Sequence, residues 1–75
     1  MKTRNTVRRC DIYNNGSRLA LEITEYKTLY KAEVLDDTKF IPHIATLRVT
    51  KTACKGGFTE AAFIFRDMCI NNKYF

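Results

Sequence analysis

The sequence contains no tryptophan, one histidine, one proline and no apolar run near the roughly 18 residues that a membrane span requires. We therefore expect no membrane partner. The basic amino-terminal residues are followed by no apolar stretch, which argues against a signal peptide. The three cysteines are odd in number and widely spaced, unlike the dense, even pattern of a secreted disulfide scaffold. We expect free thiols and a cytoplasmic location, in the host cytoplasm if the chain is viral.

Catalytic and metal-binding residues are also few. Hydrolysis needs a nucleophile, a base and an orienting group within reach of one another, and His43 is the single histidine. Zinc ligands usually occur in pairs about two to four residues apart, and Cys10, Cys54, Cys69 and His43 show no such pairing. We expect no enzyme activity, no metal and no cofactor. A reaction that pairs His43 with a cysteine remains as the catalytic alternative.

The apolar residues suffice for one small core. The 75 residues are 45% hydrophobic and 28% charged, which is a globular composition. Their number predicts a single small domain, 1–75, with residues 1–6 as a flexible basic arm.

Alternation of apolar and polar residues predicts strands in the first two thirds of the chain. Residues 7–13 favour β-structure and end at Asn15-Gly16, a pair typical of a type I′ hairpin turn. Residues 19–24 and 30–34 alternate with the period of two that a half-buried strand shows, although a partly helical 19–34 is left open. A further strand is expected at 44–52, after Pro42.

The period changes after Gly56-Gly57. Apolar residues recur at helical spacing over residues 59–72, with Thr59 as the expected N-cap and Glu60 in the first turn. The prediction is an α+β fold: an antiparallel sheet of three to four strands packed by one C-terminal amphipathic helix.

Strands, a glycine turn and a helix opening Phe58-Thr59-Glu60-Ala61-Ala62 resemble the sheet-plus-helix DNA-binding domains of the integrase amino-terminal kind. The resemblance covers residues 28–72 and lacks the tryptophan characteristic of those domains. It implies a DNA-binding sheet, and we assign no residue roles from it.

Positive charge is unevenly distributed along the chain. Thirteen Lys and Arg against eight Asp and Glu give a net charge of +5, and residues 1–10 and 38–59 contain no acid. Such segments can form a positive surface that attracts phosphates or an acidic protein. The expected cations, which we predict to share one surface away from the carboxylates, are Arg4, Arg8, Arg9, Lys39, Arg48, Lys51 and Lys55.

Two further features bear on partners. Gly56 and Gly57 precede a helix amino terminus, where free amides suit an anion, or they simply form a strand-to-helix turn. Tyr26, with cations on the open sheet face, offers a ring beside charge, a combination that stacks on bases. Those cations are Arg18, Lys31 and Arg48.

Apolar residues outside the main helix stripe are candidates for a protein interface or a homodimer contact. They are Phe63, Ile70, Tyr74 and Phe75.

Together these features predict a non-enzymatic basic module that contacts nucleic acid, or a nucleic-acid-handling protein complex, through phosphate-directed Lys and Arg. The alternative is a small inhibitor or adaptor of the phage or mobile-element type. It would block an enzyme of host defence or nucleic-acid metabolism by protein-protein contact.

Overall fold

The Asn15-Gly16 turn forms as the sequence predicts. In the computed structural model, which describes residues 5–75, Asn15 and Gly16 both have positive φ, 51° and 83°. They join β1 (Thr6–Asn14) to β2 (Ser17–Glu25). Thr6 pairs with Glu25, so the expected basic arm of residues 1–6 is wrong at Thr6, which belongs to β1. Residues 1–4 lie outside the described part of the chain.

Two more antiparallel strands complete the sheet. β3 (Leu29–Leu35) pairs with β2, and β4 (His43–Thr50) pairs with β3, in the order β1-β2-β3-β4. Residues 19–34 therefore contain two strands with a turn between them, and the helical alternative is wrong. The α+β prediction is confirmed.

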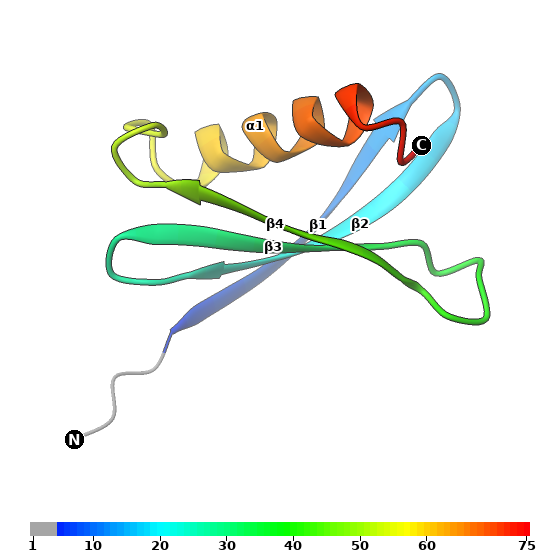
Figure 1. Cartoon of the computed structure of the whole chain (residues 1–75), viewed down its shortest axis with the longest axis horizontal. Coiled ribbons are helices and arrows are strands. Elements are labelled where there is room, and N and C mark those ends of the chain that lie inside the picture. The colour runs from blue at the N-terminus through cyan, green and yellow to red at the C-terminus, as the bar shows by residue number, and fades with distance from the viewer. Residues whose placement is uncertain (1–4) are drawn as a thin grey trace.

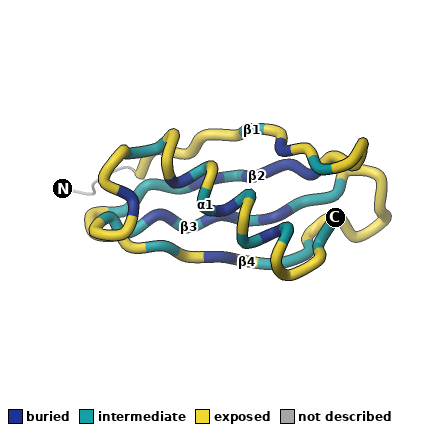
Figure 2. The backbone as a smooth tube through the Cα atoms, turned by 90° about the horizontal axis from the view of Figure 1, so that it is seen from above, coloured by how far each residue is buried: buried dark blue, intermediate teal, exposed yellow. Residues whose placement is uncertain are grey.

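The helix α1 (Phe58–Asn71) covers one face of this sheet and leaves the other open (Figure 1). Alternate residues of the two central strands, β2 and β3, are almost fully buried, and these buried positions lie beneath α1 (Figure 2). Phe65 and Cys69 of α1 are 0% exposed, as are Leu21, Ile23 and Val34 of the sheet. Burying such side chains stabilises the fold by about 1.5–3 kcal/mol each.

The helix begins one residue earlier than expected. Its N-cap is Gly57, with φ 80° and ψ −149° and no side-chain cap, so the prediction of Thr59 as N-cap is wrong. The Glu60 carboxylate, in the first turn, accepts a hydrogen bond from the amide of Gly56, the residue before the N-cap, at 3.2 Å.

Candidate nucleic-acid interface

Arg8 and Arg9 lie on opposite faces of β1 because neighbouring side chains of a strand alternate. The Arg8 guanidinium lies 5.1 Å from the centre of the Phe58 ring, on the α1 side. Arg9 lies on the open face and pairs with Glu22 at 3.3 Å and with Asp37 at 2.7 Å. These exposed pairs contribute at most about 1 kcal/mol each, but they reduce the charge that Arg9 offers a ligand.

Lys51 and Lys55 lie in the segment between β4 and α1. The Lys51 ammonium pairs with Glu25 at 2.8 Å and lies 5.4 Å from the centre of the Tyr30 ring. Lys55 is exposed. The two lysines share one end of the sheet, with the charge of Lys51 largely balanced by Glu25.

The glycine amides beside them are engaged within the chain. The Gly56 amide donates to Glu60, and the Gly57 amide donates to the Cys54 carbonyl at 3.1 Å. Each of the two glycine amides therefore already has an acceptor within the chain, in the place of the anion that the sequence suggested.

Lys39 lies at the other end of the sheet, in the loop between β3 and β4 (Figure 1). The Asp36 carboxylate close to it accepts hydrogen bonds from the Thr38 hydroxyl at 2.6 Å and the Thr38 amide at 3.0 Å. These bonds, with a smaller contribution from Lys39, lower the pKa of Asp36. Arg4 lies outside the described residues. The predicted cations therefore do not share one surface.

Arg48, one of these cations, meets two of the residues that the sequence placed with it on the open face, Lys31 and Tyr26, at a depression in the sheet. Lys31 of β3 and Arg48 of β4 are direct cross-strand partners. They line a cavity of about 280 Å³ with Tyr26, Thr28 and Leu29, residues of the β2–β3 turn and the start of β3. The Lys31 ammonium lies 5.7 Å from the centre of the Tyr26 ring, close enough for a cation–π contact.

The depression is positive because Lys31 and Arg48 line it and none of the acids within residues 5–75 does. Among the described residues, Lys31 and Arg48 have no acidic partner within ion-pair distance. The nearest acids on this face, Glu22 and Glu33, lie in the next cross-strand row, and Glu22 is bound by Arg9. A ring beside two unpaired cations is an arrangement that can hold a base and its phosphates.

The fourth residue that the sequence placed on this face, Arg18, lies near the opposite end of β2. It pairs with Asp11 at 3.2 Å and lies 3.8 Å from Asp37. Arg18 is therefore outside the depression.

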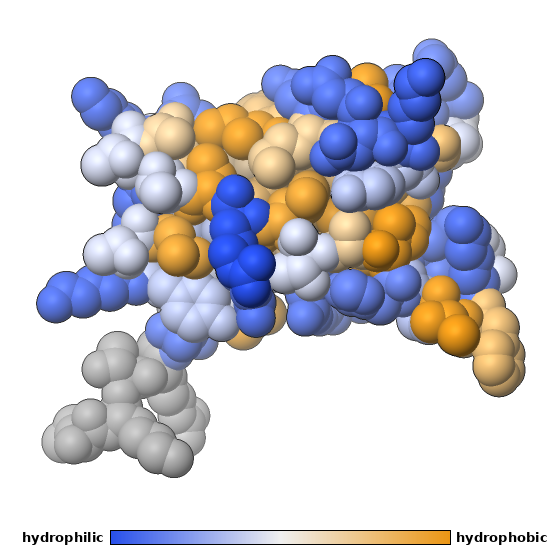
Figure 3. Space-filling view, viewed as in Figure 1, coloured by the Kyte–Doolittle hydropathy of each residue, from blue (hydrophilic) through white to orange (hydrophobic). Residues whose placement is uncertain are grey.

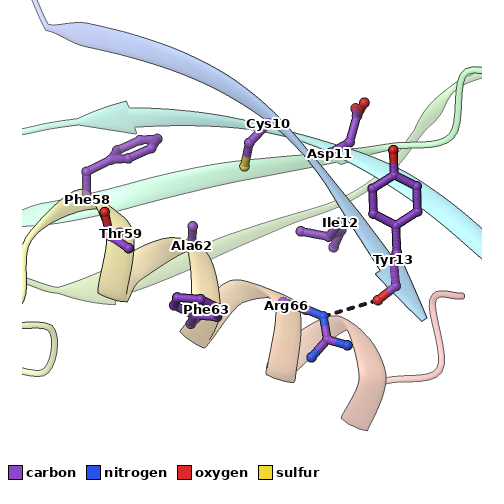
Figure 4. Close-up of a pocket in the computed structure, with 9 residues that line it drawn as sticks. All are labelled: Cys10, Asp11, Ile12, Tyr13, Phe58, Thr59, Ala62, Phe63 and Arg66. Carbon is purple, nitrogen blue, oxygen red and sulfur yellow. Dashed lines mark hydrogen bonds between the residues drawn. The ribbon is translucent and has the colours of Figure 1, made fainter.

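A second concave surface, which we call the β1–α1 groove, has an apolar lining and a volume of about 500 Å³. Cys10 and Ile12 point into it from β1, and Phe58 and Phe63 approach from α1 (Figure 4). Phe63 is 64% exposed. At the far end of the groove, Arg66 Nε donates to the carbonyl of Tyr13 at 3.1 Å.

The other predicted interface residues are less exposed than Phe63. Tyr74 and Phe75 are half-buried and pack against the core, and Ile70 is half-buried near the end of α1.

Sequence reasoning missed a different apolar surface. Phe40 and Ile41 are 101% and 72% exposed in the β3–β4 loop, which projects from the body at the lower right of Figure 3. Two large apolar residues directly before Pro42, between a turn and a strand, were the available signal.

The single histidine, His43, is exposed at the start of β4, where its Nε2 lies 3.1 Å from the Thr46 hydroxyl. Within residues 5–75 no three potential metal ligands gather in one place. No helix in this part of the chain has both the length and the apolarity for a membrane crossing.

Compared with protein-family models, curated proteins and solved structures, the chain matches none.

Proposed function

We propose that the chain binds single-stranded nucleic acid at the depression formed by Tyr26, Lys31 and Arg48. The observation that carries this proposal is the presence in one cavity of an aromatic ring and two cations that have no acidic partner in the described part of the chain. Single strands are favoured over duplexes because a base must be unpaired to stack on a ring.

Each residue has a distinct part in the proposed complex. Tyr26 stacks on one base, and its ring is held by the Lys31 ammonium. Lys31 and Arg48 contact successive phosphates, since cross-strand neighbours lie side by side across the sheet. Lys27 is exposed in the adjoining turn and extends the positive surface. The affinity is independent of sequence because phosphates carry no base information.

Charge reversal at the two ends of the sheet tests this site. Lys31→Glu should lower the affinity for a fluorescein-labelled oligothymidine roughly tenfold or more at about 50 mM salt, because a charged contact is lost. Lys39→Glu is the matched control: it changes the net charge equally, but in the distant loop, and should change affinity less than about twofold. Fluorescence anisotropy measures both.

The salt dependence provides a second measurement. With roughly three phosphate contacts, the logarithm of the association constant should fall with the logarithm of salt with a slope of about −2. If Lys31→Glu and Lys39→Glu lowered the affinity equally, binding would depend on net charge alone, and the proposed site would be wrong. The absence of any binding at low salt would contradict nucleic-acid binding altogether.

Protein contact is the second candidate function, and the apolar β1–α1 groove favours it. The groove offers an exposed ring, Phe63, above an apolar floor, as a docking surface of an inhibitor or adaptor would. A viral or mobile-element origin and a cytoplasmic location belong to this same proposal. The groove supports the protein contact, and the three free thiols, two of them buried, support the cytoplasmic location.

A further inference from the structure

β1 is an edge of the sheet, and within residues 5–75 no strand pairs with its outer side. The two-residue turn makes Asn14 and Ser17 a hydrogen-bonded pair, and such pairs recur at every second residue along the ladder. The β1 residues between these pairs direct their backbone N–H and C=O groups away from β2. They are Val7, Arg9, Asp11 and Tyr13. The Tyr13 carbonyl shows this direction, since it accepts its hydrogen bond from Arg66 of α1.

The side chains of these four residues lie on the open face and form a symmetric pattern. Val7 and Tyr13 are 60% and 58% exposed, and the oppositely charged Arg9 and Asp11 lie between them. Arg9 pairs with Glu22 and Asp37 of its own chain, and Asp11 pairs with Arg18. The two side chains are still 48% and 40% exposed, so each can also face a charge of a second copy. Charges on an edge strand usually prevent pairing with another chain. Here the two opposite charges lie at equal distances on either side of Cys10.

We propose that the chain forms a homodimer in which β1 pairs antiparallel with β1 of a second copy, about a two-fold axis at Cys10. This register places Arg9 of each copy opposite Asp11 of the other, and Val7 opposite Tyr13. An axis at Arg9 or at Asp11 would place like charges opposite each other. Axes farther along the strand oppose a charge to an apolar residue and shorten the overlap. Opposite charges stabilise a cross-strand pair and like charges destabilise it, which selects the Cys10 register.

The backbone and the groove both fit this pairing. The outward groups of two copies form roughly eight hydrogen bonds, and the Tyr13 carbonyl has a second lone pair for its share. The axis is perpendicular to the sheet, so both α1 helices lie on one side and the two β1–α1 grooves meet at the seam. Phe63 and the groove floor around Ile12 then lose contact with water (Figure 4).

Two charge variants test the interface by sedimentation equilibrium. The unmodified chain should dimerise. Arg9→Asp and Asp11→Arg should each weaken homodimerisation about 10- to 30-fold, because each places like charges opposite one another at two symmetric positions.

An equimolar mixture of the two variants should restore dimers. The carboxylate introduced at position 9 of one variant then faces the guanidinium introduced at position 11 of the other, and the unchanged Asp11 of the first faces the unchanged Arg9 of the second. Circular dichroism of each variant confirms the fold, and restoration in the mixture excludes a folding defect.

Cysteine crosslinking tests the register. Cys10 and its copy form a non-hydrogen-bonded pair in the dimer, with Cα atoms about 4.5 Å apart, within the range of a disulfide. Diamide should join the two Sγ atoms, as the thiols lose two protons and two electrons to the reagent. Burial and the neighbouring Asp11 raise the pKa of Cys10, so an alkaline buffer is used. Cys10→Ser should abolish the crosslink, because Cys54 and Cys69 are buried.

A monomer at millimolar concentration would overturn the proposal. A dimer whose dissociation constant is the same in both charge variants as in the unmodified chain would also overturn it. So would a dimer that diamide does not crosslink through Cys10. None of these results would test nucleic-acid binding at the Tyr26 depression, because neither charge variant nor Cys10→Ser alters a residue that lines it.

Discussion

Replacing Lys73 with glycine should stabilise the protein. Two backbone hydrogen bonds end α1: the Lys73 amide donates to the Ile70 carbonyl at 3.1 Å, and the Tyr74 amide donates to the Cys69 carbonyl at 3.0 Å. This is the Schellman arrangement, which places the residue after the C-cap in the left-handed region. Lys73 occupies that position with φ 60°.

The expected gain follows from the backbone. A left-handed conformation costs an L-residue about 1–2 kcal/mol, and glycine adopts it freely. Glycine also makes the unfolded chain more flexible, which cancels about 0.4–1 kcal/mol of that gain. The net stabilisation should be about 0.5–1 kcal/mol, or roughly 2–8 °C in Tm for a domain of this size.

Urea denaturation followed by circular dichroism measures the change. Lys73→Gln removes the charge and keeps the side chain, so it separates the loss of a cation near the helix C-terminus from the backbone effect. Asn72→Gly is the opposing control. Asn72 has φ −86°, where glycine gives no relief, and the substitution should destabilise by about 0.5–1 kcal/mol.

The reasoning is refuted if Lys73→Gly is no more stable than Lys73→Gln. Equal effects of glycine at positions 72 and 73 would also contradict it, because the two positions differ in the sign of φ.

Three further predictions concern other parts of the chain. Gly57→Ala should destabilise by about 1–3 kcal/mol in urea titrations; a Cβ there meets no atom within 4 Å, so the whole cost lies in the positive φ of the helix N-cap. Burial raises the pKa of Cys69 from 9.0 to about 11, so the folded state keeps this thiol protonated while the unfolded state ionises it. Stability should be intact below pH 9 and fall by on the order of 2 kcal/mol as the pH approaches 11; Cys69→Ala should lose this part of the alkaline decline in pH-dependent melts. Tyr26→Leu should weaken oligonucleotide binding about 5- to 100-fold without changing the salt slope, whereas Lys31→Ala should make the slope shallower by about 0.7.

The strands were predictable because their signals are local. Asn15-Gly16 specifies its own turn, and alternation in residues 19–23 and 30–34 identifies the buried face without knowledge of any partner strand. The helix start was less predictable. Thr59 has good N-cap chemistry, but the glycine at position 57 ends the turn earlier, and Glu60 satisfies the loop amide.

The candidate site depended on register, which one segment alone does not reveal. Arg9 loses its availability because the β1–β2 register sets it opposite Glu22, and the β3–β4 loop brings Asp37 to it from a distant part of the chain. Lys31 and Arg48 meet for the same reason, as opposed residues of β3 and β4. The net charge therefore suggested nucleic acid or an acidic protein as the partner. The strand register and the ion pairs determine which cations remain available to such a partner.

The central claim is that Tyr26, Lys31 and Arg48 form the binding surface for a single strand. An ¹⁵N-labelled sample titrated with oligothymidine tests it directly by NMR. The account predicts that amide shifts concentrate at residues 26–31 and around Arg48, with little change in the 36–42 loop at the other end of the sheet. Shifts centred on the 36–42 loop, or spread evenly over the cations of the chain, would contradict it.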